Sequence, residues 1–395
     1  MVGQEAVEAE LTAAARAARG DSAHNVSVTG AMTHAWLITG PPGSGRSVAA
    51  VSFAAALQCT ADGEPGCGRC RACVTTMAGT HADVRRIIPE GLSIGVDEMR
   101  TIVQIASRRP STGRWQVVVI EDADRLTEGA ANALLKVVEE PPPSTVFLLC
   151  APSVDPEDIS ITLRSRCRHV ALVTPTVDAI ARVLVSTDGL STEAAQWAAS
   201  VSGGHVGRAR RLATDPAARE RRQHALGLVS DAMKPKRAYA AAEELVATAD
   251  TEAKASTADR DATEAEELKT ALGAGGTGKG TGATLRGATG AIRDLERRQK
   301  SRLTRASRDG LDRALIDLAN YFRDALLVAA GAGEVRANHP DMAEPVQALA
   351  DHAVPERLLL CIEAVLECRE ALATNVKPKF AVDGLVAAVG QALRD

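Results

Sequence analysis

The chain has 395 residues, of which 45% are hydrophobic, 24% are charged and only 2% are aromatic, and its formal net charge is −4 at pH 7. This length allows two or three domains with sizeable cores, and the low aromatic content leaves Ala, Val, Leu and Ile to fill them, which favours a helix-dominated protein. The slightly acidic balance excludes a globally basic protein that coats nucleic acid, and leaves only local basic patches open.

Localisation and redox state are predicted from the same sequence. No run approaches the roughly 20 apolar residues that a membrane span needs, and the N-terminus carries acids and no apolar segment of the kind found in secretory signals. We therefore expect a cytoplasmic protein that contacts no membrane. Eight cysteines are present, and in such a chain clustered cysteines favour metal binding over disulfides.

Helices and strands are predicted to alternate over the first 174 residues. Helical spacing of apolar residues, or short buried runs, define each segment. The predicted helices span 4–18, 45–59, 94–110 and 127–141, and the predicted strands span 34–40, 82–90, 115–124, 145–152 and 168–174. This alternation predicts an α/β domain of three layers with a mainly parallel sheet.

The strand signal disappears after about residue 174. A small helical bundle is expected over 175–215, and longer helices from about 217 onward, ending with 380–395. The stretch GAGGTGKGTGATLRGATG, residues 273–290, is rich in Gly and Thr and lacks periodicity. We interpret it as a flexible linker or insertion.

A near match to a nucleotide-binding P-loop follows the strand at 34–40. The pattern G-x-x-x-x-G-K-[ST] is met at Gly40, Gly45 and Ser47, but Arg46 replaces the lysine. The loop backbone and the following helix N-terminus would cradle phosphates, and Ser47 would bind Mg²⁺. The alternative is a glycine-rich turn between strand and helix. A planar guanidinium cannot fit the β/γ-phosphate site as a lysine ammonium does.

Two acids, Glu121 and Asp122, end the strand at 115–124, where P-loop ATPases carry a metal-binding acid and an acid that activates water. The usual order is Asp then Glu, so both carboxylates would be displaced by about a bond length, and an error of about 1 Å can be costly to catalysis. The alternative is a pair of solvated acids. The candidate nucleotide-binding residues are Gly40, Pro42, Gly43, Ser44, Gly45, Arg46, Ser47, Glu121 and Asp122.

Four cysteines, Cys59, Cys67, Cys70 and Cys73, form the pattern C-x7-C-x2-C-x2-C. Close C-x2-C pairs let thiolates converge on one tetrahedral Zn²⁺ at about 2.3 Å each, and four sulfur ligands close the site, so the zinc would be structural. The alternative is four reduced thiols in a loop.

The segment TLRSRCRHV places Arg166 just before the last predicted strand. Such an arginine is usually a surface charge. Here it also fits an arginine finger that reaches the γ-phosphate bound by a neighbouring subunit.

Together these motifs resemble one family, the AAA+ clamp-loader subunits of bacterial DNA polymerase III. The resemblance rests on GPPGSGRS, on the cysteine module that follows the P-loop helix, on EDADRLTEGAANALLKVVEEPP and on TLRSRC, and covers about residues 3–170 by motif. It implies an AAA+ base domain over 1–173 with a zinc module at about 58–75, a helical lid over 174–216, and an all-α collar domain over 217–395 that assembles a five-subunit ring and contains a flexible insertion at about 250–290.

Three departures separate this chain from the ATP-hydrolysing motor (gamma/tau) subunits of that family: Arg46, the order Glu121-Asp122, and Gly207 at the position of the lid's sensor arginine, with Arg208 one residue off. They resemble the subunit whose own nucleotide site is weakened. The resemblance then implies a stator that supplies Arg166 in trans, with weak or absent ATPase of its own. A motor subunit is the alternative, and a free-standing P-loop ATPase is a more distant one.

The resemblance also implies the partners and cofactors. These are the motor (gamma/tau) and delta subunits, the sliding clamp and primer-template DNA through the complex, structural Zn²⁺, and weakly bound ATP/Mg²⁺, all within a DNA polymerase (nucleotidyltransferase) holoenzyme. Residues 292–310 hold seven basic residues against three acids. We prefer a solvated helix face there, with DNA contact as the alternative.

Overall fold

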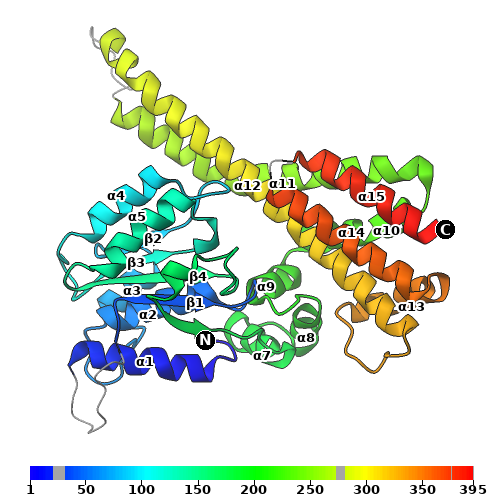
Figure 1. The fold of residues 1–395 in the computed structure, drawn as a ribbon, viewed down its shortest axis with the longest axis horizontal. Coiled ribbons are helices and arrows are strands. Elements are labelled where there is room, and N and C mark those ends of the chain that lie inside the picture. Colours follow the sequence, from blue (N-terminus) through cyan, green and yellow to red (C-terminus); the bar gives the residue numbers. More distant parts are fainter. Residues whose placement is uncertain (21–31, 273–280, 375, 395) are drawn as a thin grey trace. The chain divides into compact units, whose positions relative to one another are not determined.

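The structure, a computed structural model, describes residues 1–20, 32–272, 281–374 and 376–394, with the backbone alone for 281–288. The chain divides into two compact units, Met1–Ala213 and Thr214–Asp395 (Figure 1). Within these described ranges, no helix is both long and apolar enough to cross a lipid bilayer.

A five-stranded parallel sheet forms the centre of the first unit, in the strand order β2-β3-β4-β1-β5. The strands are β1 (Ala35–Thr39), β2 (Val84–Ile87), β3 (Gln116–Ile120), β4 (Thr145–Ala151) and β5 (Arg168–Ala171). The three central strands are buried at every residue, as apolar runs such as TVFLLCA require in a sheet that is covered on both faces. The predicted α/β class with a parallel sheet is confirmed, and each strand lies within its predicted segment.

Helices cover both faces of this sheet. They are α1 (Glu5–Arg19), α2 (Arg46–Gln58), α3 (Arg71–Met77), α4 (Val96–Ala106), α5 (Glu128–Glu139) and the short α6 (Ile161–Arg164), with a 3-10 turn, η1 (Ala123–Arg125). On one face, Leu11 of α1 and Phe53 of α2 share a core with Trp36 of β1. Met99 of α4 and Leu134 of α5 belong to the core on the other face. Parallel strands need such helical crossovers, because a hairpin cannot join them.

The carboxyl ends of β1 and β3 lie at the same edge of the sheet, with β4 between them. The loop at 40–45 leads from β1 into α2, and Glu121 and Asp122 directly follow β3. Open parallel sheets bind their ligands at this edge. The fold therefore brings the phosphate-binding pattern and the acid pair to the same edge.

Three short helices complete the first unit: α7 (Val177–Asp188), α8 (Thr192–Ser200) and α9 (Val206–Thr214, whose last residue belongs to the second unit). The Thr176 side chain accepts a hydrogen bond from the Ala179 N–H at the start of α7, and Ser191 caps α8 in the same way. Leu184 and Ala198 are fully buried in their common core. Whether these helices form a domain separate from the sheet stays a prediction.

The described residues of the second unit form helices joined by loops, with no strand among them. Its elements are α10 (Pro216–Ala232), α11 (Pro235–Ala271), α12 (Thr281–Ala329), η2 (Pro340–Met342), α13 (Ala343–His352), α14 (Pro355–Ala373) and α15 (Pro378–Arg394). Proline opens α10, α11 and α14, where its missing N–H costs no hydrogen bond. The core includes Leu315, Phe322, Leu358 and Val382.

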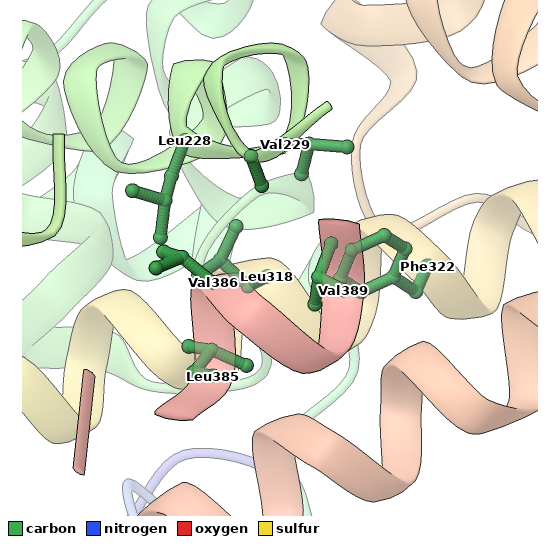
Figure 2. A pocket seen from close by; sticks show the side chains of 8 residues that line it. Leu228, Val229, Leu318, Phe322, Leu385, Val386 and Val389 are labelled. Atoms are coloured by element: carbon green, nitrogen blue, oxygen red, sulfur yellow. The ribbon is translucent and has the colours of Figure 1, made fainter. Parts of the chain in front are cut away.

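A small apolar cavity lies within this helical core (Figure 2). Its walls come from α10, α12 and α15, and it is lined by Leu228, Val229, Ala232, Leu318, Phe322, Leu385, Val386 and Val389. Since every lining side chain is apolar, the cavity offers no polar group that would orient a ligand, and we interpret it as a packing gap.

The expected flexible insertion at about 250–290 is wrong over most of its length. Residues 250–271 continue α11, and 281–290 belong to α12, which runs beside α11 (Figure 1). Ala253 and Thr257 are buried and continue the four-residue spacing of the α11 core, and Arg302 of α12 bonds to Asp261 and Glu264. Residues 273–280 lie outside the described part of the chain. The Gly/Thr-rich stretch begins only at residue 273, so an insertion drawn from about 250 included Ala- and Glu-rich residues that favour a helix.

Candidate nucleotide and metal sites

The P-loop pattern connects β1 to α2 with a backbone that requires glycine. Gly43 has a φ of 86° and Gly45 a φ of 96°, a region that residues with a Cβ rarely adopt. A Cβ on Gly43 would also lie 2.5 Å from the Cβ of His205. The loop therefore depends on glycine both for its own turn and for close contact with the segment before α9.

Arg46 is directed back onto its own loop. Its Nη1 donates a hydrogen bond to the Gly40 carbonyl at 2.8 Å, across the turn. The hydroxyl of Ser44 is buried and has no hydrogen-bond partner among the described residues. A buried hydroxyl without a partner is unfavourable, so the loop keeps one polar group available while its cation bonds to the backbone.

His205, which the sequence analysis did not single out, covers the loop at Gly43. Its Nδ1 accepts the Arg208 N–H at 3.2 Å at the start of α9. Gly203 and Gly204, both at positive φ, form the turn before it. This pair of glycines was the signal in the local sequence that the segment before α9 approaches the P-loop closely. Gly207, in the first turn of α9, has no side chain that could contact a nucleotide.

The two acids after β3 already have basic partners. Arg86 of β2 donates to Glu121 Oε1 from Nε at 3.1 Å and from Nη2 at 2.7 Å, and the Glu121 side chain is only 13% exposed. Asp122 has a φ of 54° and lies 3.9 Å from Arg125. Each of the two predicted site acids thus lies near an arginine of the same unit, and the sequence pattern alone did not identify Arg86.

A third acid, Asp124 in η1, was also missed. One of its oxygens is buried with no hydrogen-bond partner among the described residues. Burial raises the pKa of the Asp124 carboxyl and the charge of Asp122 raises it further, while Arg125 and Arg46 oppose the rise. The charge of Arg46 therefore favours the ionised form of Asp124, which is neither of the two acids predicted from the sequence.

Arg166 follows α6 at the surface and has defined partners. Its Nη2 lies 2.5 Å from Glu139 Oε1, and its Nη1 donates to the Thr162 carbonyl at 3.1 Å and to the Ser165 hydroxyl at 3.2 Å. The Arg166 side chain is 38% exposed. The guanidinium is therefore accessible from outside the unit, yet held from two sides.

The four clustered cysteines converge between α2 and α3. Their Sγ atoms all lie within 4.8 Å of one another, and the Sγ atoms of Cys59 and Cys70 are 3.9 Å apart. Tetrahedral ligands at about 2.3 Å from Zn²⁺ would be about 3.8 Å apart. The residue types and their separation therefore fit a metal ion such as zinc.

Local hydrogen bonds favour the thiolate form at part of this cluster. The Cys70 N–H donates to Cys67 Sγ at 3.3 Å, and the Cys73 N–H donates to Cys70 Sγ at 3.5 Å. At Cys70, burial raises the pKa, but hydrogen bonds from Cys73 and Thr60 outweigh it and lower the pKa to about 5. Burial raises the pKa of Cys73. A metal would have to displace that proton, as thiolate ligation requires.

A family model described as "DNA polymerase III, delta subunit" matches residues 21–176. Over this region the chain matches the DNA polymerase III delta-subunit family. The match contains the P-loop, the cysteine cluster, the acid pair and Arg166, so all the candidate sites lie in the part that the clamp-loader family shares.

Individual relatives belong to more than one subunit type of the clamp-loader family. The chain is 40% identical over 145 residues to DNA polymerase III subunit delta' of Escherichia coli (strain K12), covering 36% of this chain and 43% of that protein. It is 38% identical over 138 residues to subunit tau of Bacillus subtilis (strain 168), covering 35% of this chain and 24% of that protein. A solved gamma subunit-related protein from Thermotoga maritima is similar over 91% of this chain and 94% of that one, at a TM-score of 0.41 and 17% identity. The chain thus spans less than half the length of these two curated relatives.

Proposed function

We propose that this chain is a delta'-like subunit of the DNA polymerase III clamp loader, which helps to load the sliding clamp onto primed DNA during replication. Its own ATPase is weak or absent, and Arg166 completes the nucleotide site of a neighbouring gamma/tau motor subunit. The partners would be the motor and delta subunits, with the clamp and primer-template DNA bound through the complex. Family membership of the region 21–176 supports the setting.

The ion pair between Arg86 and Glu121 is the observation that carries this proposal. A metal-binding acid must offer its oxygens to Mg²⁺, but Oε1 of Glu121 already accepts two N–H bonds from Arg86. Hydrogen bonds to charged groups contribute roughly 1.5–3 kcal/mol each. Releasing Glu121 would sacrifice these bonds and leave the half-buried Arg86 without its acid.

Arg46 supports the same conclusion from the opposite side of the site. In an active P-loop, a lysine reaches the β- and γ-phosphates. Here the corresponding guanidinium bonds to the Gly40 carbonyl. Both the cation and the acid that hydrolysis would use are therefore engaged within the chain, whereas Arg166, which pairs with Glu139, keeps a side chain that is 38% exposed.

We also propose that Cys59, Cys67, Cys70 and Cys73 hold one structural Zn²⁺. Four thiol ligands leave no open position for a substrate, so the ion would stabilise the loop between α2 and α3 and take no part in catalysis.

A gamma/tau-type motor subunit is the second candidate. The tau relative and the retained glycine geometry of the P-loop favour it. ATP turnover by the isolated chain separates the two functions, because a motor subunit carries its own lysine and acids whereas a stator depends on its neighbour.

The test measures DNA-stimulated ATP hydrolysis by the chain alone and by the loader reconstituted with motor and delta subunits. We expect negligible turnover by the chain alone. Arg166→Ala should remove most of the turnover of the one site that it completes in the reconstituted loader, since a group of this kind is worth about 10³-fold or more in comparable enzymes. Arg164→Ala, which removes an exposed arginine two positions earlier, is the matched control and should leave the rate unchanged. Turnover by the isolated chain, or an unchanged rate with Arg166→Ala, would overturn the proposal.

A further inference from the structure

We infer that Glu139 is a positioning residue for Arg166, which holds the guanidinium in the orientation that a neighbour's bound ATP needs. The inference rests on the proposed function of Arg166 and adds a residue to it. Glu139 is the last residue of α5, and its Oε1 lies 2.5 Å from Arg166 Nη2.

Two elements hold the same guanidinium from different directions. The Thr162 carbonyl and the Ser165 hydroxyl, in and directly after α6, accept from Nη1, while Glu139 of α5 pairs with Nη2. An arginine side chain loses about 2 kcal/mol of rotamer entropy when it is fixed. These contacts fix it before the neighbour arrives, so less of that entropy remains to be lost on assembly.

The geometry leaves donors for a phosphate. A guanidinium has five N–H groups on three nitrogens; both hydrogen bonds of Arg166 come from Nη1, and Glu139 pairs with Nη2. Nε makes none of these contacts, so its N–H can donate to an oxyanion. Glu139 therefore need not leave when Arg166 meets a phosphate.

The ion pair between Arg166 and Glu139 is too exposed to contribute much to the stability of the fold. The side chains of Arg166 and Glu139 are 38% and 41% exposed, and exposed ion pairs contribute only about 0–1 kcal/mol to folding. Loss of Glu139 should consequently leave the fold and assembly intact, so an effect on catalysis can be read separately.

The chain provides a matched control one residue away. Glu140 is exposed at the end of α5, and the described residues show no ion pair for it. Glu140→Ala removes the same charge from the same region but leaves the Arg166 contacts in place.

The experiment uses the reconstituted loader and compares Glu139→Ala, Glu140→Ala, Arg166→Ala and the double variant of Glu139 and Arg166. We expect Glu139→Ala to cause at least about half of the loss in kcat caused by Arg166→Ala, since misplacing a catalytic group by about 1 Å is costly. The KM for ATP, the assembly state and the thermal midpoint should stay unchanged. In the Arg166→Ala background, removal of Glu139 should have no further effect, which is the signature of two residues acting as a unit.

The outcomes separate the two ideas. If Arg166→Ala leaves kcat unchanged, the finger role fails and this inference fails with it. If Arg166→Ala lowers kcat but Glu139→Ala does not, only the positioning role of Glu139 is overturned. A higher kcat with Glu139→Ala would also overturn it, because Glu139 would then restrain the arginine.

Discussion

Arg46 shows at the scale of one residue how a basic side chain in a P-loop pattern can bond to the loop's own backbone. Lysine places a compact ammonium at the end of a flexible stem, whereas arginine presents a broad fork. In this chain one nitrogen of the fork bonds to the Gly40 carbonyl at 2.8 Å. The positive charge is retained, but its hydrogen-bonding capacity is partly used within the loop.

Replacing Arg46 with lysine should therefore strengthen nucleotide binding. We expect Arg46→Lys to raise the affinity of the isolated chain for ATP by about tenfold, since a lysine at this position can reach the β/γ-phosphates. Calorimetric titration with ATP and Mg²⁺ measures the change. Hydrolysis should stay negligible, because Glu121 remains bonded to Arg86.

Arg164→Lys makes the same chemical change away from the loop and serves as the control. An affinity that is unchanged or lower in Arg46→Lys, compared with this control, would contradict the explanation based on Arg46.

Among the elements, the cysteine module shows how a loop with only a small hydrophobic cluster is organised. It joins α2 to α3 and also contacts α1. Arg19 of α1 donates to the carbonyls of Cys59 at 2.9 Å, Ala61 at 3.2 Å and Gly63 at 2.9 Å. Hydrogen bonds from α1 therefore hold the module in place, in addition to the contacts among its own cysteines.

Metal analysis tests this element directly. Protein purified without chelator should contain about one zinc per chain, and Cys67→Ser should remove it, because three thiolates bind the ion less tightly than four. Cys167→Ala, which changes a cysteine outside the cluster, should retain the metal. Elemental analysis that finds no zinc in the unaltered chain would refute the site.

How far the sequence predicts the structure also differs by element. The three central strands were predictable because each is a largely apolar run, as in TVFLLCA before Pro152. The cysteine cluster was predictable because its ligands are close in sequence. The contacts of Glu121 with Arg86, 35 residues away, and of His205 with Gly43 were not, since folding alone brings them together. The helical structure of residues 250–271 and 281–290 was not predicted, and contacts such as that of Arg302 with Asp261 join residues far apart in the sequence.

For the whole molecule, each unit contains a carboxylate whose pKa the fold lowers. Asp83, which is 2% exposed, lies before β2; burial raises its pKa, but the N–H groups of Ser111, Gly113 and Thr112 outweigh this and hold it below its usual range. In the second unit, hydrogen bonds from Arg222 likewise lower the pKa of Asp341 against the effect of burial. A lowered folded-state pKa stabilises the fold above the ordinary pKa of about 4, and this stabilisation is lost as the pH falls below it.

We therefore expect both units to lose stability as the pH drops below about 4. Asp83→Asn should lower stability at pH 7, since an amide supplies one acceptor where the carboxylate supplies two, and should flatten the acid-dependent loss of the first unit. Urea unfolding at pH 7 and pH 3 measures both effects. Asp97→Asn, at a side chain that is 91% exposed, is the control, and an acid dependence as steep in Asp83→Asn as in that control would count against this explanation.

The 49-residue helix α12 has a mechanical consequence. At 1.5 Å per residue it is about 74 Å long, and its C-terminal half carries Leu311, Leu315 and Phe322 in the helical core. Its N-terminal half runs along α11, where the ion pairs of Arg302 stiffen it. One continuous helical backbone therefore connects Thr281 to the core of the second unit, with no loop in between.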